Sequence, residues 1–477
     1  MDINYAAILP EIILSLVGVL VMVLVPSLKK EQQATLGWVS VGGIAAALVA
    51  AASQVGTASS PAFYGMIVQD EFGTVARILL LTVSGLIAAS AIPYLRRENI
   101  LRGEFFSLLL FATVGMCFMA SSSDLVMTFL GLETLSIATY ILAGMRQKAD
   151  VKSAEAAWKY FILGAFSTSF MLYGIAFLYG QAGSTGYSEI ASYIAVGDYG
   201  ATLYLGVGLL LVGFGFKVAM APFHVWAPDV YQGAPLPVTS HLAVGSKAAG
   251  FIALVRIVQQ VTPGVNEFWA DALWMGAVLT MAIGNVAALS QRNLKRLLAY
   301  SSIAHAGYIL VGVTAHNQLG AQGVLYYLSA YALMTIGALV VIQIISLKGE
   351  AGIELDDFKG IGFKAPFLTM SLSIFLISMA GIPATAGFMG KFFLFSAAVQ
   401  QGLYWLVVIA VITSAVGLYY YLRVIVVMFM QQGSSQPLSV EMTGALRTII
   451  VLLVLGTLLL GLYPAPLLEL ANGAVQF

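Results

Sequence analysis

Charged residues are scarce in this sequence. Asp, Glu, Lys and Arg make up only 9% of the 477 residues, whereas a soluble globular protein carries about 25%. The 22 basic and 22 acidic side chains cancel each other, so no general excess of positive charge suggests binding to nucleic acid. This composition excludes an ordinary soluble domain and directs attention to the lipid bilayer.

Cysteine and histidine are scarce as well. The single cysteine, Cys117, excludes an internal disulfide and a CxxC site for a metal or an iron–sulfur cluster. The four histidines show no HxxxH spacing, and no glycine-rich nucleotide loop lies between a predicted strand and a helix. We therefore expect no metal, haem or nucleotide cofactor in this chain.

Long apolar runs dominate the sequence. Hydrophobic residues make up 60% of it, and runs of about 20 residues, each long enough to cross roughly 30 Å of hydrocarbon, recur along its whole length. A transmembrane β-barrel would show short alternating segments instead. We predict an all-α polytopic membrane protein with about 14 transmembrane helices in a single domain, residues 1–477. The predicted spans cover 6–27, 35–56, 73–95, 104–122, 124–144, 155–180, 201–221, 236–257, 269–290, 296–316, 321–347, 365–398, 403–430 and 447–471.

The distribution of basic residues predicts the orientation. Loops after the odd-numbered spans hold most of the 22 lysines and arginines, Lys29, Arg146 and Lys148 among them, and loops after the even-numbered spans hold none. The positive-inside rule then places both termini on the non-cytoplasmic side. Residues 1–27 lack a basic residue before their apolar core, and Glu11 interrupts that core. We expect a retained first helix and not a signal peptide.

Two halves of five spans each are expected, at about 104–257 and about 269–430, flanked by helices within 1–95 and 447–471. Because five is odd, the second half would start from the opposite side of the membrane, which gives two inverted repeats. Each half contains one span broken by proline and glycine, and each broken span carries a lysine, Lys217 or Lys391.

Five ionisable residues are singled out as lying well inside predicted spans: Glu133, Lys159, Lys217, Lys247 and Lys391. Each costs about 2.5–3.5 kcal/mol at a helix centre, so each must be paired or hydrated. A nearby carboxylate favours the charged form of a buried lysine, and burial favours the neutral form, so such a lysine can take up and release a proton. The alternatives are ion pairs that lock helices together or, for Lys159 and Lys217, a side chain that reaches the interface.

The first break lies beside Lys217. Pro222 follows this lysine by five residues and frees backbone carbonyls, which need water or another partner at membrane depth. His224 lies beside the break, and His305 shares a helix face with Ser301 and Tyr308. Both histidines are candidates for a proton relay, and a satisfied buried histidine is an equal alternative for each.

Four segments carry a resemblance to a known family: FLGLETLSIATYIL, EAAWKYFILGAFST, GFGFKVAMAPFHVWAPDVYQGAP and GIPATAGFMGKFF. They resemble the antiporter-like, Mrp-related membrane subunits of respiratory complex I, over nearly the whole chain. Within this family a lysine at position 391 favours the N type of subunit, because the M type typically has a glutamate there.

The resemblance implies a role for each buried residue. Glu133 and Lys217 would form the coupled pair of the first half, and Lys159 would modulate Lys217. Lys247 would connect the halves, His305 would contribute to the hydrated path, and Lys391 would be the proton site of the second half.

The resemblance also implies partners and a location. The chain would translocate protons while other membrane and peripheral subunits oxidise NADH with quinone, and those subunits would hold the flavin and the iron–sulfur clusters. The location would be the bacterial plasma membrane. The alternatives are an Mrp-type cation/proton antiporter subunit, the membrane arm of a related hydrogenase, and a scaffold that transports nothing.

Overall fold

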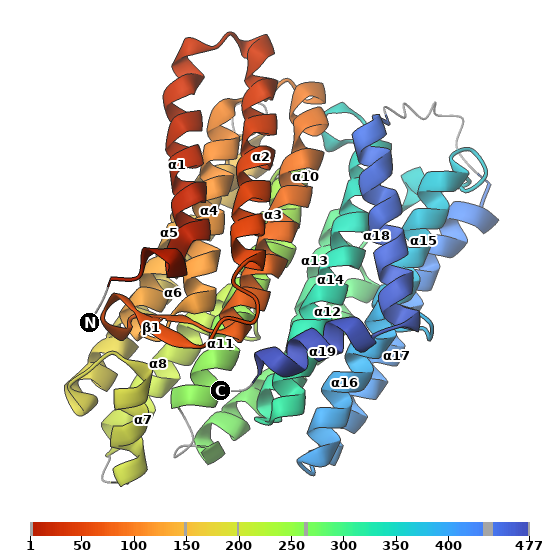
Figure 1. Cartoon of the computed structure of the whole chain (residues 1–477). Coiled ribbons are helices and arrows are strands. Elements are labelled where there is room, and N and C mark those ends of the chain that lie inside the picture. The colour runs from red at the N-terminus through yellow and green to blue at the C-terminus, as the bar shows by residue number, and fades with distance from the viewer. Residues whose placement is uncertain (1–2, 147–149, 198–199, 262–265, 433–441, 476–477) are drawn as a thin grey trace.

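Apolar helices make up almost all of the computed structural model, which describes residues 3–146, 150–197, 200–261, 266–432 and 442–475 (Figure 1). Lys148, which the charge pattern includes, lies outside these ranges. Within them, thirteen helices are long and apolar enough to cross a membrane. The remaining predicted span, 365–398, which is the twelfth along the chain, is divided between two helices of 15 residues each. The prediction of an all-α polytopic membrane protein is confirmed.

The first part of the chain contains α1 (Leu9–Leu24), α2 (Gln33–Ala52), β1 (Ser60–Ala62), β2 (Ile67–Gln69), α3 (Glu71–Arg97), α4 (Gly103–Ser121), α5 (Leu125–Ala143), α6 (Val151–Ala182), α7 (Tyr187–Val196), α8 (Ala201–Val218), α9 (Trp226–Gly233), α10 (Leu236–Ser240), the π-helical turn η5 (His241–Ser246) and α11 (Lys247–Val261). The antiparallel pair β1–β2 and the short helix α7 lie in connections for which no regular structure was predicted.

The second part contains α12 (Asn266–Leu289), α13 (Leu294–Thr314), α14 (Gln318–Ile345), the short turn η6 (Lys348–Glu350), α15 (Pro366–Ala380), α16 (Ala386–Gln400), α17 (Tyr404–Met430), α18 (Gly444–Leu462) and α19 (Ala465–Ala474). Figure 1 shows α1–α3 standing on one side of the molecule and α15–α18 on the other, with α19 lying across between them.

Local sequence signals set many helix ends. The side chain of Asp124 accepts hydrogen bonds from the backbone N–H groups of Val126 and Met127, which have no partner inside the helix. At the other end, α6 stops at Gly183 in the left-handed conformation, which glycine adopts without a steric penalty. Such caps fix where the spans begin and end.

Both predicted breaks are present. Helix α8 ends at Val218, Ala219 has a φ of +59°, and the chain resumes a helix only at Trp226. Helix α15 ends at Gly381, with a φ of +84°, and α16 begins at Ala386 after Pro383. Each break therefore combines a left-handed residue with a proline, and each leaves helix-end carbonyls inside the bundle.

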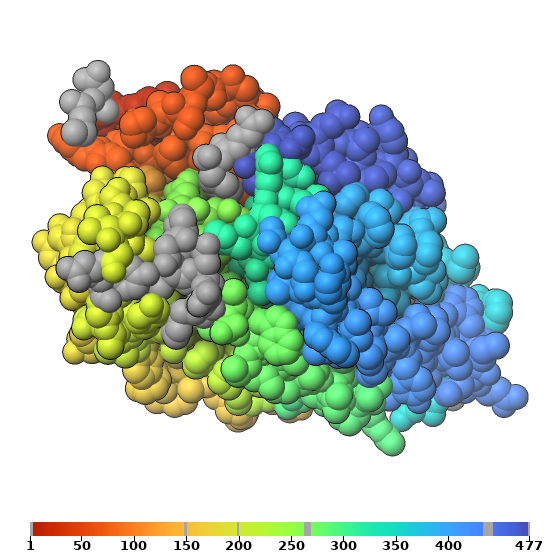
Figure 2. All heavy atoms as spheres, turned by 90° about the horizontal axis from the view of Figure 1, so that it is seen from below, coloured from red at the N-terminus to blue at the C-terminus, as the bar shows by residue number. Residues whose placement is uncertain are grey.

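The helices that carry Lys247 and His305 lie at the centre. Every residue in the most apolar stretch of 236–261 is buried, as are 94% in that of α13, whereas only 28% in that of α17 are buried. Large apolar side chains such as Leu16, Leu455 and Leu459 are exposed on the outer helices. Cys117, in contrast, is fully buried in α4. Seen from below, segments of the two halves pack side by side as one body (Figure 2).

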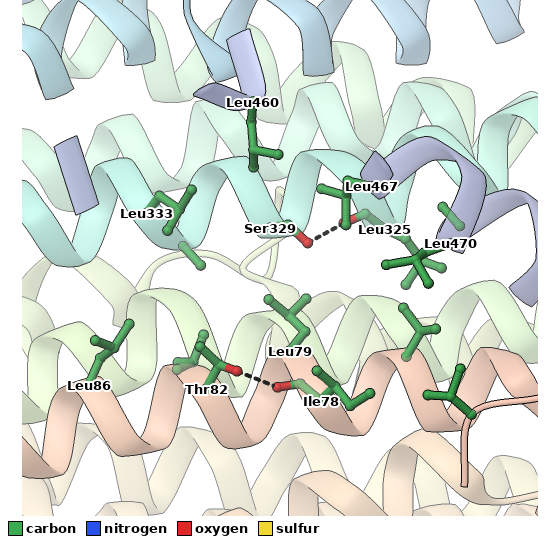
Figure 3. A pocket seen from close by; sticks show the side chains of 15 residues that line it. Ile78, Leu79, Thr82, Leu86, Leu325, Ser329, Leu333, Leu460, Leu467 and Leu470 are labelled. Atoms are coloured by element: carbon green, nitrogen blue, oxygen red, sulfur yellow. Dashed lines mark hydrogen bonds between the residues drawn. The ribbon is translucent and has the colours of Figure 1, made fainter. Parts of the chain in front are cut away.

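An apolar cavity of about 270 Å³ lies between α3, α14, α18 and α19. The hydroxyls of Thr82 and Ser329 face this space but donate to carbonyls of their own helices, Ile78 O at 2.7 Å and Leu325 O at 3.0 Å (Figure 3). The rest of its lining is aliphatic. None of the predicted proton-carrying residues lines it, so it is separate from the site described next.

Candidate functional site

Four titratable side chains are buried in the centre of the helical bundle. Lys217, Lys247, His305 and Lys391 are 3%, 1%, 1% and 6% exposed, respectively. They lie on α8, α11, α13 and α16, so both halves contribute. Such burial has to be compensated by specific partners, and these partners define the site.

Lys217 lies in the last turn of α8, directly before the first break. Its ammonium donates to Ser136 Oγ on α5 at 3.1 Å. Its side-chain stem packs against Gly250 on α11, where an added Cβ would lie 3.3 Å from Lys217 Cγ. A Cβ at position 250 would also lie 3.0 Å from Val218 Cγ1, so any larger residue there would have to shift the side chains of α8.

Glu133 lies one turn before Ser136 on α5 and acts electrostatically on Lys217. However, no ion pair within 4.0 Å joins these two described residues. Glu133 Oε1 is buried and has no hydrogen-bond partner in the described part of the chain. The structure thus brings Glu133 and Lys217 into electrostatic range and leaves Ser136 as the direct partner of the lysine.

Lys247 begins α11 immediately after the π-helical turn η5. Its ammonium donates to the backbone carbonyl of Ser302 at 2.7 Å and also to the Ser302 hydroxyl. Ser302 lies on α13, in the second half. Lys247 thus links α11 to α13, which lie in the two ranges predicted to form separate halves. π-helical turns occur often at functional sites.

His305 is enclosed by tyrosines. Its Nδ1 lies 2.5 Å from the hydroxyl of Tyr327, and its Nε2 lies 3.0 Å from that of Tyr421. Tyr421 also bonds Ser301, and the ring of Tyr331 packs against the histidine with centroids 5.2 Å apart. Both ring nitrogens therefore have a partner. Sequence reasoning missed Tyr327, Tyr331 and Tyr421, whose only signal is the presence of single or consecutive tyrosines within apolar runs.

Lys391 occupies the second break. Its ammonium donates to the carbonyls of Met379 and Ala380, each at 3.1 Å, and to Ser414 Oγ at 2.8 Å. The two carbonyls end α15, where the helix dipole favours a cation. The ring of Tyr308 lies 4.8 Å from the ammonium. An open cavity of about 570 Å³, lined by Lys391, Gln400 and mainly apolar side chains, leads away from this lysine.

Lys159 has a different environment. Its side chain is 38% exposed and forms ion pairs with Glu155 and Asp229, each at 2.6 Å. Asp229 also binds Arg296 at 2.7 Å. Burial would raise the pKa of Asp229, but hydrogen bonds from Lys159 and Arg296 lower it. The structure thus places Lys159 at the end of the bundle in an ion-pair network, apart from the buried lysines.

His224 lies in the turn between α8 and α9 and is partly buried. Its Nδ1 is buried and lacks a partner among the described residues. His241, to which sequence reasoning gave no role, is fully buried in η5, and neither of its ring nitrogens has a partner in that part of the chain. Buried polar atoms without a partner mark places where ordered water is expected.

Comparison with known proteins places this arrangement in a family. Residues 122–417 match the transmembrane family described as NADH:quinone oxidoreductase/Mrp antiporter. NADH-quinone oxidoreductase subunit N of Trichlorobacter lovleyi is 45% identical, and the match covers 99% of this chain and 97% of that protein. Subunit N 1 of Solibacter usitatus is 43% identical over 97% of this chain and 96% of that protein.

Solved structures agree with the sequence matches. A chain of respiratory complex I from Thermus thermophilus with bound aureothin is 35% identical, with a TM-score of 0.83 over 97% of this chain and 99% of that chain. A chain of the Mrp complex from Dietzia has the same fold, with a TM-score of 0.86 and 20% identity over 99% of this chain and 97% of that chain. The chain belongs to the NADH:quinone oxidoreductase/Mrp antiporter family of membrane subunits and, within it, to the subunit N type.

Proposed function

We propose that this chain carries protons across the membrane as one subunit of an NADH:quinone oxidoreductase. One observation carries the proposal. Lys217, Lys247 and Lys391 donate only to hydroxyl and carbonyl oxygens, and within the described residues none lies within 4.0 Å of a carboxylate. A buried ammonium without a counter-charge is costly, so a small change in its surroundings can make it release its proton.

Other buried cations of the same chain provide the contrast. Arg77 pairs with Glu11 at 3.5 Å, Arg256 with Asp70 at 2.6 Å, and Lys295 with Glu350 at 2.6 Å. These pairs have the form expected of charges that hold helices together. The three central lysines have no carboxylate partner of this kind among the described residues, which supports a role in proton transfer over the scaffold alternative.

The polar groups between Lys247 and Lys391 supply a route for protons. Ser302 binds Lys247, and its neighbour Ser301 binds Tyr421, which in turn contacts His305. Further along, Asn285 accepts from Tyr420 at 3.1 Å and donates to Tyr308 at 2.9 Å. The ring of Tyr308 lies against the Lys391 ammonium. Water or side-chain rotation would close the remaining gaps between these groups.

We propose that protons enter at the first break and leave at the second. Glu133 and Lys217 would form the input of the first half, with Lys159 and His224 beside it. Lys391 would release protons through its open cavity to the other side. This scheme rests on two inverted repeats and on both termini lying on the non-cytoplasmic side. The flavin, the iron–sulfur clusters and the quinone site would belong to partner subunits. The whole assembly would lie in a bacterial plasma membrane, in keeping with relatives that are named as subunits of NADH-quinone oxidoreductase.

The test is NADH-driven proton uptake by inside-out membrane vesicles containing the assembled complex. Lys217→Ala and Lys391→Ala are compared with wild type and with Lys30→Ala, a control at an exposed lysine. NADH oxidation and the amount of assembled complex are measured in the same vesicles. We expect uptake to fall in both buried variants while assembly holds. Normal uptake and oxidation per assembled complex would refute the proposal. Sodium-dependent transport without NADH would favour the Mrp-type alternative.

A further inference from the structure

A second buried cluster of charged and polar side chains lies at the ends of membrane spans, where α3, the end of α5 and the start of α13 meet the loop after α14. It consists of Tyr94, Arg146, Lys295 and Glu350, and we call it the Glu350 cluster. Arg146, Lys295 and Glu350 are 5%, 0% and 8% exposed, respectively. None of these residues belongs to the proton site described above, so their burial requires a separate explanation.

Each oxygen of the Glu350 carboxylate has two hydrogen-bond or ion-pair partners. Its Oε2 lies 2.6 Å from Lys295 Nζ and 3.1 Å from Arg146 Nη1. Its Oε1 accepts from the backbone N–H of Leu236 at 2.8 Å and from the hydroxyl of Tyr94. Two positive charges, a hydroxyl and a helix N-terminus thus converge on one side chain.

The contact with Leu236 joins the cluster to the proton site. Leu236 is the first residue of a continuous helical span, 236–261, that includes Lys247. Lys295 additionally donates to the carbonyl of Ala234 at 2.6 Å, so the turn that leads into this span is held on both sides. A carboxylate at a helix N-terminus satisfies a free N–H and interacts favourably with the helix dipole.

Lys295 joins the cluster to the partner of Lys247. It lies one residue into α13, the helix that carries Ser302 seven residues later. Lys247 lies 11 residues after Leu236 on its own span, roughly 16 Å along the helix axis. Glu350 therefore contacts the beginnings of the two helices that the Lys247–Ser302 hydrogen bond connects further inside the bundle.

The backbone at Glu350 is held in a costly conformation. Glu350 has a φ of +54°, and the preceding Gly349 has a φ of +79°. A residue other than glycine persists in this left-handed region only where its surroundings determine it strongly. Arg146 donates to the Gly349 carbonyl at 2.8 Å, and the Gly349 N–H donates to Glu98 at 2.8 Å. Both backbone groups of Gly349, directly before the strained residue, are thus held.

We propose that Glu350 is a positioning residue that sets the relative register of α10–α11 and α13, and through it the contact between Lys247 and Ser302. The inference rests on the proposed function, because it assigns Glu350 to the proton path through Lys247. Arg146 and Leu236 belong to the first half, and Lys295 and Glu350 belong to the second. The cluster therefore transmits a displacement of either half to the central lysine.

The test compares Glu350→Gln with Glu350→Asp in inside-out vesicles of the assembled complex. Glutamine keeps the shape but removes the charge, and aspartate keeps the charge on a shorter side chain. Asp356→Asn, an exposed carboxylate of the same loop, is the matched control. We expect proton uptake per NADH oxidised to fall at least about two-fold in Glu350→Gln, because supporting contacts hold functional groups in place. Glu350→Asp is expected to recover most of the ratio, and the control all of it.

Hydrogen–deuterium exchange of the peptide covering 234–246 supplies the second measurement. We expect faster exchange there in Glu350→Gln and unchanged exchange in α17. If uptake and oxidation fall in parallel with the amount of complex, so that the ratio per NADH stays at the wild-type value, Glu350 only stabilises the fold and the inference is wrong. Lys217→Ala and Lys391→Ala are measured in the same experiment, so that a failure of this inference can be distinguished from a failure of the proposed function. If they abolish uptake and Glu350→Gln leaves the ratio unchanged, only this inference fails.

Discussion

Lys247 and Ser302 connect the two halves of the chain. The lysine ammonium of the first half donates to both the carbonyl and the hydroxyl of a serine in the second half. Hydrogen bonds to a charged group contribute about 1.5–3 kcal/mol, more than those between neutral groups. Because the Ser302 hydroxyl takes part in this contact, its removal is expected to affect the Lys247 ammonium directly.

Ser302→Ala removes the hydroxyl and leaves the backbone carbonyl in place. Lys247 then keeps one acceptor of the two, so we expect a partial loss of NADH-driven proton uptake with normal assembly. Ser302→Thr restores a hydroxyl and is expected to restore most of the uptake. Equal uptake in the serine, alanine and threonine forms would show that this hydroxyl takes no part in transfer.

His305 can be separated from its tyrosine partners by two substitutions. His305→Phe leaves the hydroxyl of Tyr327 without this partner, at a cost of about 1–3 kcal/mol for an unsatisfied buried group, whereas Tyr421 keeps its contact with Ser301. His305→Gln can still bond a hydroxyl but cannot carry a proton in the same way. We expect both variants to lose uptake, and only His305→Phe to lower the thermal stability of the purified complex. Full uptake in His305→Gln would assign the histidine a structural role.

Lys159 is expected to have less influence than Lys217. Partly exposed ion pairs contribute about 0–1 kcal/mol and weaken with added salt. We expect Lys159→Ala to reduce proton uptake less than Lys217→Ala does, by an amount that shrinks as the salt concentration rises. Glu155→Gln, which breaks only the pair with the neighbouring turn, is the control. A loss as large as that of Lys217→Ala at every salt concentration would contradict this assignment.

Gly381→Ala tests the second break. A residue other than glycine is strained at a φ of +84°, and a Cβ there would lie 3.1 Å from both Cδ and Nζ of Lys391. Gly402 has a similar φ of +72° with nothing near a potential Cβ, so Gly402→Ala carries the same backbone penalty alone. We expect both variants to lose about 1 kcal/mol or more of stability and only Gly381→Ala to lose proton uptake per assembled complex.

The Glu350 cluster predicts a dependence on pH. Burial raises the pKa of Glu350, but the charges of Lys295 and Arg146 outweigh burial and hold it below its ordinary value of 4.5. The unfolded chain therefore binds this proton more readily than the folded chain. The stabilisation is complete above pH 4.5 and is lost as the pH falls through the lower, folded value.

Thermal unfolding of the detergent-solubilised complex, followed by tryptophan fluorescence between pH 6 and pH 3, measures this effect. Asp70 behaves in the same way. Burial raises its pKa, but the charge of Arg256 lowers the pKa by more, so Asp70 also stabilises the fold less as the pH falls through this range. The informative quantity is therefore the difference between wild type and Glu350→Gln. We expect that difference to shrink as the pH falls. A constant difference would show that the charge of Glu350 does not stabilise the fold.

The spans, both breaks and the buried lysines could be predicted from the sequence because each has a local signal. A lysine within an apolar run is costly wherever the run packs, and a proline combined with glycine favours a break in a helix because it removes a backbone N–H. The direct partner of Lys217 could not be predicted in this way. Ser136 and Glu133 lie one turn apart on α5, and only the packing of α5 on α8 makes Ser136 the contact.

The tyrosines around His305 and the Glu350 cluster illustrate the limit of sequence reasoning. Tyr327 and Tyr421 are ordinary residues of apolar helices until α14 and α17 bring their hydroxyls to one imidazole. Glu350 lies in a short polar loop, where a carboxylate is normally solvated. Its burial depends on contacts with four segments distant in the sequence, and no periodicity in the chain encodes those contacts.

The burial of Cys117 has a practical consequence. It is the chain's single cysteine, and its side chain is fully enclosed within α4 and its neighbours. Maleimides react with accessible thiolates, so the native chain is expected to stay unlabelled while folded. A cysteine introduced on the outer surface, for example in place of Leu455, would then be this chain's sole reporter for fluorescence or spin-label spectroscopy, with the natural sequence otherwise intact.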